Sequence, residues 1–399
     1  MRLKKLNIQH ITVANIINFL FGIFFVTKMI RSFSGSSVAG GIWNYVQIAM
    51  FLIGVVLLLS FLKYFISDLT FLILLLFTGF SMINSLIFIK FNTEDIFDFL
   101  MLAYPFCVFI IAYYISVYTC IEKNYILKLS FYIISSIFIF SMIKGGIYST
   151  TIGAVADVYY VLGLYPLALI CSKHKYVPSL ICGMAVLLSG KRLGIVLFVL
   201  MVGAYYLFIA IQQKNLKRLL SLIFIIIVFF FIASNIGLNY NEYLWYRLER
   251  MIYDNDSSGR NFIWLRVVSL LKESNIKYII FGHGDGSVTR MIGTHAHNDF
   301  LEIFYDFGFL PLVMYILFFI RCIVELIDML KNKYENAVVF AITILFSIGV
   351  AMFSFYYIMP TYITCGMLCK GYILCDYRKK YKPEFSMLKY KQLRFKLFS

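Results

Sequence analysis

Apolar runs of about twenty residues recur along the chain and alternate with short polar turns. A helix of that length crosses the hydrocarbon core of a bilayer, and the polar turns between such helices lie at its surfaces. The pattern predicts an all-α protein, a polytopic transmembrane helical bundle of about 12 spans. The expected spans lie near residues 11–30, 43–62, 67–87, 98–118, 125–144, 152–172, 176–190, 191–212, 218–237, 299–325, 337–356 and 361–376.

One polar interruption, residues 238–298, is far longer than the other turns and separates the ninth expected span from the tenth. Its apolar positions recur at helical spacing, which predicts short helices rather than a linker. We expect helices over residues 241–252 and 259–273, the second capped by Ser258, with an apolar side formed by Trp264, Val267, Val268 and Leu271. The expected parts are the first nine spans (1–237), the loop domain (238–298), the last three spans (299–376) and a basic tail (377–399).

The distribution of charge predicts the orientation of the chain. Its net charge is +16, and Lys and Arg gather at the N-terminus, in alternate turns and in the tail. Cytoplasmic loops carry the excess of Lys and Arg, so both termini are expected in the cytoplasm and the loop domain outside. Tyr, Phe and Leu interleave with the cations of the tail, a pattern typical of anchoring on anionic membrane lipids rather than of nucleic-acid binding. The 8 cysteines lie in or beside apolar segments, which argues against a disulfide framework and a cysteine metal site.

Several charged residues stand where a membrane protein rarely places them. Lys191 and Arg192 occupy a short turn, LLSGKR, on the expected outer side. They either extend toward lipid headgroups or form an anion site. Arg260 falls in the first turn of the expected helix 259–273, where a forked donor beside free backbone N–H groups suits phosphate; the alternative is an exposed surface arginine. Asp157, inside the sixth expected span, is a further functional candidate, or it lies near the outer interface.

Residues 281–310 form the stretch with the most candidate functional residues, among them three histidines, His283, His295 and His297. Glycines, among them Gly282 and Gly284, permit tight turns and close approach to a ligand. From Asn298 onward the stretch reads as a helix, with Asp299, Glu302 and Asp306 on one face. These carboxylates orient a base, hold sugar hydroxyls or compensate the helix dipole.

Three interpretations of the His295–Ala–His297 pattern remain open. The histidines could ligate zinc, with Asp285 or Asp299 as a third ligand, although the spacing differs from that of metalloenzyme helices. They could be structural histidines bonded to loop carbonyls. A neutral imidazole could instead act as a general base. Cations that hold a diphosphate leaving group and a base that deprotonates a hydroxyl together indicate glycosyl transfer from a membrane-held diphosphate lipid.

Four motifs of the chain resemble the bacterial O-antigen ligase/polymerase (Wzy-type) superfamily. They are SGRNFIWLR at 258–266, FGHGDG at 281–286, HNDFLEIFYDFGFLP at 297–311 and the arginine that follows LLSG near 190. The resemblance covers roughly residues 150–325. It implies transfer of a glycan from undecaprenyl diphosphate to a sugar hydroxyl, with inversion and without a metal or other cofactor, at the outer face of the bacterial cytoplasmic membrane.

The resemblance also implies roles for individual residues. Arg192 and Arg260 are expected to bind the diphosphate and His297 to be the base. Further expected substrate contacts are Lys191, Arg266, His295, Asn298, Asp299, Glu302, Gly282 and Gly284. A repeat-unit polymerase is preferred, with the lipid-linked oligosaccharide as substrate and a flippase and chain-length regulator as partners. A ligase that acts on lipid A core or protein is the alternative, and a lipid or sugar transporter is the rival of another class.

Overall fold

The computed structural model describes residues 2–87, 99–120, 124–145, 157–213, 259–354 and 360–382, with the isolated residues 122 and 220. Secondary structure in these ranges is helical throughout. The helices are α1 (Arg2–Ser34), α2 (Ser37–Ser60), α3 (Leu62–Ser67), α4 (Leu69–Leu86), α6 (Tyr104–Tyr118), α7 (Tyr125–Gly145), α9 (Val158–Cys171), α10 (Tyr176–Ser189), α11 (Arg192–Gln213), α14 (Arg260–Glu273), α15 (Ile276–Phe281), α16 (Ser287–Ile292), α17 (Asp299–Phe307), α18 (Phe309–Lys331), α19 (Ala337–Phe353) and α20 (Pro360–Tyr381).

The described helices confirm an all-α, multi-pass membrane protein. Within the described ranges, seven segments are long and apolar enough to cross a bilayer: Val13–Ser34, Ser37–Ser60, Leu69–Leu86, Phe99–Tyr118, Tyr125–Ile143, Arg192–Ile211 and Phe309–Lys331. The helices α9, α10 and α19 are apolar but shorter. The expected span 218–237 and the expected helix 241–252 lie outside the described residues. The total of about 12 spans therefore stays a prediction.

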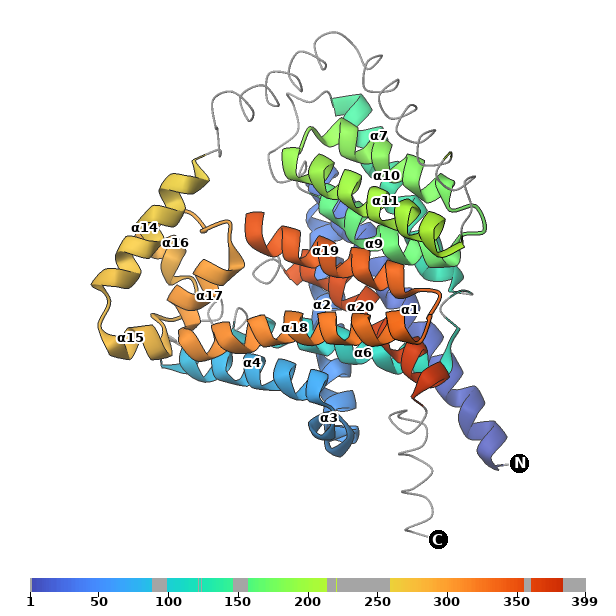
Figure 1. Cartoon of the computed structure of the whole chain (residues 1–399), viewed down its shortest axis with the longest axis horizontal. Helices are drawn as coiled ribbons and strands as arrows, with labels where there is room; N and C mark the ends of the chain where they lie inside the picture. Colours follow the sequence, from blue (N-terminus) through green and yellow to red (C-terminus); the bar gives the residue numbers. More distant parts are fainter. Residues whose placement is uncertain are drawn as a thin grey trace.

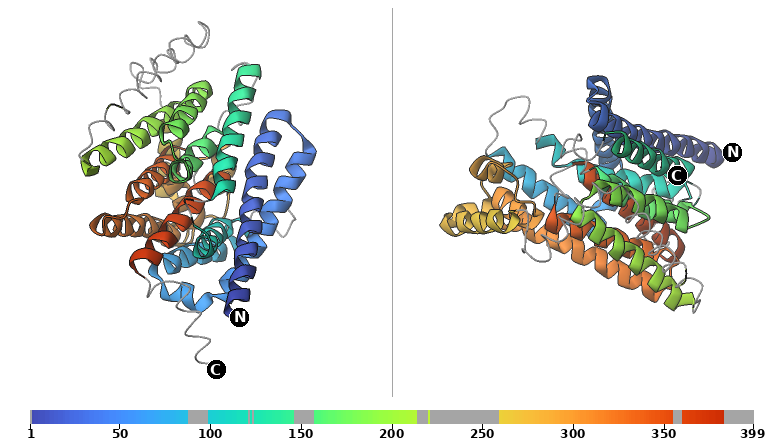
Figure 2. Two further views of the ribbon diagram at one scale, coloured as in Figure 1. Left: turned by 90° about the vertical axis from the view of Figure 1, so that its right-hand side faces the viewer. Right: turned by 90° about the horizontal axis from the view of Figure 1, so that it is seen from above.

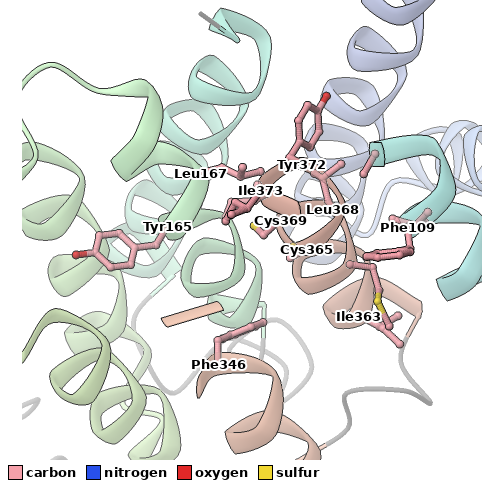
Figure 3. Close-up of a cluster of buried hydrophobic side chains, with 14 of the residues drawn as sticks. Phe109, Tyr165, Leu167, Phe346, Ile363, Cys365, Leu368, Cys369, Tyr372 and Ile373 are labelled. Atoms are coloured by element: carbon pink, nitrogen blue, oxygen red, sulfur yellow. The ribbon is translucent and has the colours of Figure 1, made fainter. Parts of the chain in front are cut away.

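Helix α20 lies at the centre of the bundle, packed against α6, α9 and α19 (Figures 1 and 2). Small residues allow its close approach to two neighbours. A Cβ atom at Gly163 of α9 would lie 2.5 Å from the Cβ of Cys365, and one at Gly371 would lie 2.8 Å from the carbonyl oxygen of Phe109 in α6. Cys365 and Cys369 are fully buried among the apolar side chains of Figure 3, which indicates that their role is packing.

The last turn of α20 is buried in an ionic network, although the sequence predicts a basic tail from residue 377. The Arg378 guanidinium bonds Asp68 Oδ2 at 2.5 Å and Glu325 Oε1 at 2.9 Å, and all three side chains are buried. A buried cation requires such partners. The pairing carries α20 on to Tyr381, so the helix extends past the expected end at 376.

Helices α14 to α17 form a separate layer at one end of the bundle, the end where α18 begins and α19 ends (Figure 1). They enclose a small core of their own, made of Val267, Leu270, Leu271, Val288, Ala296 and Tyr305. Helix α14 matches the expected helix 259–273 closely, but its N-cap is Gly259 in a left-handed conformation, without a side-chain cap bond. Its buried face includes Leu270, and Val268 is only half-buried.

The tenth expected span, 299–325, is two helices in the structure, because the chain breaks at Gly308. Gly308 has a φ of 90°, and a Cβ atom there would lie 2.3 Å from the carbonyl oxygen of Ile280. Asn84 of α4 donates a hydrogen bond to the Phe307 carbonyl just before the break. The break keeps the short helix α17 in the end layer and starts the membrane helix α18 at Phe309.

Candidate functional site

The segment 293–298 carries His295 and His297 and is held at both of its ends. The Trp264 indole Nε1 of α14 donates to the Ala296 carbonyl at 2.8 Å. The Asn298 side chain accepts from the Leu301 amide at 3.2 Å and caps α17. Between these anchors His297 has a φ of 53°, a left-handed conformation that is costly for a residue with a Cβ. The surrounding contacts thus impose a strained backbone on this histidine.

The acidic face of α17 holds the segment and its neighbours in place. Asp299 accepts from the Tyr315 hydroxyl of α18 at 2.8 Å. Glu302 contacts His295 Nδ1 at 2.6 Å and the Ala296 amide at 3.0 Å. Asp306 accepts from the amides of Gly286 and Val288. The three carboxylates are at most 2% exposed, so each acts as an internal support. Of the two histidines in the pattern, Glu302 orients His295 and not the expected base.

The two histidines have opposite electrostatics. The hydrogen bond from Glu302 raises the pKa of His295 above its ordinary value. Burial, followed by the charges of Arg260, His295 and Lys191, lowers the pKa of His297 to about 4. His297 is therefore neutral at pH 7 and able to accept a proton, whereas the contact with Glu302 favours the protonated form of His295.

Three segments that are distant in sequence meet at His297. Lys191, in the turn between α10 and α11, and Arg260, in the first turn of α14, both act on the imidazole through their charges. Arg260 also acts on the Tyr159 hydroxyl of α9, which hydrogen-bonds to Ser354 after α19. The sequence singles out Lys191, Arg260 and His297, and the structure brings these three together. Tyr159 and Ser354 carry no sequence signal, because an apolar helix and its end give no indication of what they face.

The other two arginines of the expected set lie differently. Arg192 is half-buried at the first position of α11, directly after Lys191. The Arg266 side chain is exposed, whereas α14 buries Val267, Leu270 and Leu271. Arg266 is six positions after Arg260, which puts the two side chains about 120° apart around the helix. The described structure therefore places Arg260, and not Arg266, beside the imidazole.

The glycine-rich turn of 281–286 packs directly on the end of α17. The His283 amide donates to the Tyr305 carbonyl at 3.0 Å and the Gly284 amide to the Asp306 carbonyl at 2.8 Å. The His283 ring stacks between Tyr278 and Tyr305, with ring centroids 4.7 and 4.2 Å away. A Cβ atom at Gly282 would lie 2.2 Å from the Asp306 carbonyl oxygen. Backbone contact accounts for Gly282, and His283 is a packed, structural histidine.

A metal site is the remaining possibility for this region. Among the described residues no group of three or more His, Cys, Asp and Glu side chains is arranged to hold a metal ion. The Nδ1 atom of His295 is engaged by Glu302 and also lies 3.0 Å from the Thr289 hydroxyl. The site instead offers the cations Lys191 and Arg260 near the His297 imidazole, which suit an anionic ligand.

Residues 177–316 match a family model described as O-antigen ligase (Wzy_C). The match supports the O-antigen ligase/polymerase superfamily for this part of the chain. The matched segment begins in α10 and ends in α18, so the O-antigen ligase domain contains Lys191, Arg260 and His297. A search of curated proteins gives no match to the chain.

Proposed function

We propose that the protein is a polysaccharide repeat-unit polymerase that transfers a glycan from undecaprenyl diphosphate to a sugar hydroxyl of a second lipid-linked repeat unit. The observation that carries the proposal is the meeting of Lys191, Arg260 and His297 within the O-antigen ligase domain. Two cations and a neutral imidazole are what a diphosphate leaving group and a hydroxyl nucleophile require.

The cations serve the leaving group. Arg260 opens α14 and Arg192 opens α11, so both guanidinium groups stand beside backbone N–H groups that α-helical hydrogen bonds leave unused. Lys191 adds a third positive charge next to them. Negative charge builds on the diphosphate as its bond to the sugar breaks, and fixed cations stabilise that charge in the transition state.

His297 serves the nucleophile. The acceptor hydroxyl oxygen bonds to the anomeric carbon while the bond from that carbon to the diphosphate oxygen breaks. The hydroxyl proton passes to His297, and undecaprenyl diphosphate leaves with the electron pair. Arg260 and Lys191 help to depress the pKa of His297. A bound diphosphate offsets these two positive charges, so donor binding raises the basicity of the imidazole when the base is needed.

A ligase is the second candidate, because the matching family model is described as O-antigen ligase. The two activities differ in the acceptor: another lipid-linked repeat unit for a polymerase, and lipid A core or protein for a ligase. In both cases we propose that the reaction takes place at the outer face of the bacterial cytoplasmic membrane. We further propose that flippase and chain-length regulator proteins supply the substrate and limit the product of the polymerase.

The test uses purified protein in detergent and lipid-linked repeat units extracted from a host strain that lacks the protein. A polymerase lengthens these glycans without another acceptor, whereas a ligase forms product only when lipid A core or an acceptor protein is added, by transferring the glycan to it. The Arg260→Ala protein is the control and should form no product. A transporter would transfer no glycan in detergent, where no leaflets exist, so the formation of product excludes a transporter. If no product forms with any acceptor, the proposed function is rejected.

Orientation is tested separately. A reporter fused near Ser274 should be extracytoplasmic and one fused after Lys382 cytoplasmic. Reporters on the same side would contradict the proposed placement of the site.

A further inference from the structure

A second polar cluster lies beside Lys191, formed by side chains of α1, α2 and the residue that precedes α9. Lys28 Nζ lies 4.0 Å from Asp157 Oδ1 and 5.4 Å from the centre of the Trp43 ring. The Arg31 guanidinium carbon lies 5.1 Å from the same ring. None of these four residues falls in the O-antigen ligase domain at 177–316. The cluster therefore needs an explanation that the matched domain does not supply.

Two buried polar atoms of the cluster lack a hydrogen-bond partner among the described residues, namely Asp157 Oδ2 and Trp43 Nε1. Asp157 is only 2% exposed; on α1 the Ser32 hydroxyl hydrogen-bonds to its carboxyl group and Lys28 is its ion-pair partner, so Oδ2 is the one oxygen without a partner among the described residues. An unsatisfied buried polar group is costly to the folded state. An ion pair at 4.0 Å is loose, and a purely structural Lys28–Asp157 pair leaves both atoms unsatisfied. One atom is an acceptor and the other a donor, and a hydroxyl can serve both.

The cluster adjoins the candidate site through one residue. The charge of Lys191 acts on the Asp157 carboxylate and also on the His297 imidazole. Lys191 is therefore within electrostatic range of both the cluster and the base. Arg260 approaches the same imidazole from α14, whereas the cluster belongs to α1, α2 and α9. Arg260, which is proposed to bind the leaving group, and the cluster thus belong to different elements of the structure.

We propose that Lys28, Arg31, Trp43 and Asp157 form a subsite for a sugar residue of the acceptor glycan. A sugar hydroxyl donates to Asp157 Oδ2, a sugar oxygen accepts from Trp43 Nε1, and the two cations donate to further oxygens. The Asp157 carboxylate would repel a phosphate group, and a lipid tail would satisfy neither buried atom. A polyhydroxylated ligand therefore fits the chemistry best. The acceptor role rests on the proposed function, because only glycosyl transfer needs a hydroxyl delivered to His297.

Binding is measured by calorimetry with the oligosaccharide that mild acid releases from the host's lipid-linked glycan. The wild-type protein should bind it, and Asp157→Asn should weaken binding by roughly tenfold or more, because a hydrogen bond to a charged group is lost. Trp43→Phe keeps an aromatic ring but loses the N–H donor, and it should weaken binding about fivefold. Asp328→Asn at the other end of the helices is the matched control and should bind as the wild type does. Arg260→Ala should also keep this affinity, because it serves the leaving group.

Turnover of the lipid-linked glycan separates a subsite from a structural role. Both subsite variants should raise the half-saturating concentration of the glycan by the same factor as the loss of binding, with kcat close to wild type. A purely structural role instead lowers the thermal unfolding temperature and leaves affinity and half-saturation unchanged. If Asp157→Asn does not fold, Trp43→Phe decides, since it keeps an aromatic side chain at this position.

The outcomes for the subsite and for the reaction are distinct. Wild-type affinity in Asp157→Asn or Trp43→Phe overturns the subsite, even if the wild-type protein is an active transferase. A wild-type protein that binds no oligosaccharide also overturns it. A protein that binds the oligosaccharide at this cluster but forms no product with any acceptor rejects the proposed function and leaves the sugar site standing.

Discussion

His295 Nδ1 lies 2.6 Å from Glu302 Oε1, and the second oxygen of the same carboxylate accepts from the Ala296 amide at 3.0 Å. One buried glutamate thus holds two consecutive residues, and the next residue is His297. The position of the proposed base therefore depends on the side chain that holds the two residues before it. The same arrangement explains why His295 is the paired histidine and His297 the neutral one.

We expect Glu302→Gln to destabilise the protein by roughly 1.5–3 kcal/mol, because the change weakens charged hydrogen bonds of a buried group. Thermal unfolding in detergent measures the loss. Glu335→Gln is the matched control, since Glu335 is exposed and pairs with Lys380 at 2.9 Å; it should change stability by less than about 0.5 kcal/mol. Equal effects of the two substitutions would contradict the supporting role of Glu302.

The stability of the protein should also depend on pH through His295. Its folded-state pKa is raised by Glu302, so its contribution is fully present below the ordinary histidine pKa and is lost as the pH rises through the raised value. The unfolding temperature should fall over this interval, above about pH 6.5. His295→Gln should flatten this part of the profile. A wild-type profile that rises with pH in the same interval would show that His295 is not the paired, protonated group.

His297 should be dispensable for stability but not for catalysis. His297→Gly removes the cost of a Cβ at a φ of 53°, so the unfolding temperature should stay the same or rise, by up to about 1 kcal/mol in stability. Glycosyl transfer should fall by about 10²–10⁴-fold when the general base is lost. A folded His297→Gly protein with near wild-type turnover would refute the proposed base.

The pH profile of the wild-type reaction tests the same residue. A pKa of about 4 for His297 leaves the base deprotonated above that pH, so kcat/KM should show no acid limb from this group until about pH 4. Donor binding brings a diphosphate beside the ring and raises its pKa, so the acid limb of kcat should lie at higher pH than that of kcat/KM. Coincident limbs would show that the diphosphate does not bind next to His297.

Two glycines separate a steric clash from backbone strain. Gly282 and Gly293 both have a positive φ, but a Cβ at Gly282 would lie 2.2 Å from a backbone oxygen, whereas one at Gly293 would meet nothing within 4 Å. We expect Gly293→Ala to cost about 1 kcal/mol through strain alone. Gly282→Ala must also displace the end of α17 and should cost at least twice as much in thermal unfolding. Equal costs would show that the turn does not pack against α17 as described.

The two arginines of α14 should differ in their effect on activity. Arg260→Ala removes a cation beside His297 and should lower turnover by hundreds-fold, as expected for a donor that stabilises transition-state charge. Arg266→Ala changes an exposed side chain and should keep turnover within a few-fold of wild type. Steady-state rates with the lipid-linked glycan decide. The reverse order would transfer the diphosphate site to the other face of α14.

Much of the fold follows from local sequence. The membrane helices over Leu69–Leu86 and Tyr125–Ile143 follow from the length of apolar runs, because a bilayer selects a helix by its local hydropathy. The cap of α17 by Asn298 and the helix 260–273 are also local, since capping and helical periodicity involve residues within four positions of each other. The residue types Lys191, Arg260 and His297 are visible as candidates because charge and imidazole are unusual beside membrane helices.

Only the tertiary structure decided what each of these residues faces. Asp299, Glu302 and Asp306 are equivalent by spacing, yet they bond Tyr315, His295 and the glycine-rich turn respectively. The proximity of Lys28 to Asp157 joins residues more than a hundred positions apart. Periodicity reports which side of a helix is apolar but not which helix packs against it. These partners are set by the packing of α1, α9 and α14 around the bundle, where backbone contacts at glycines fix how closely the segments approach.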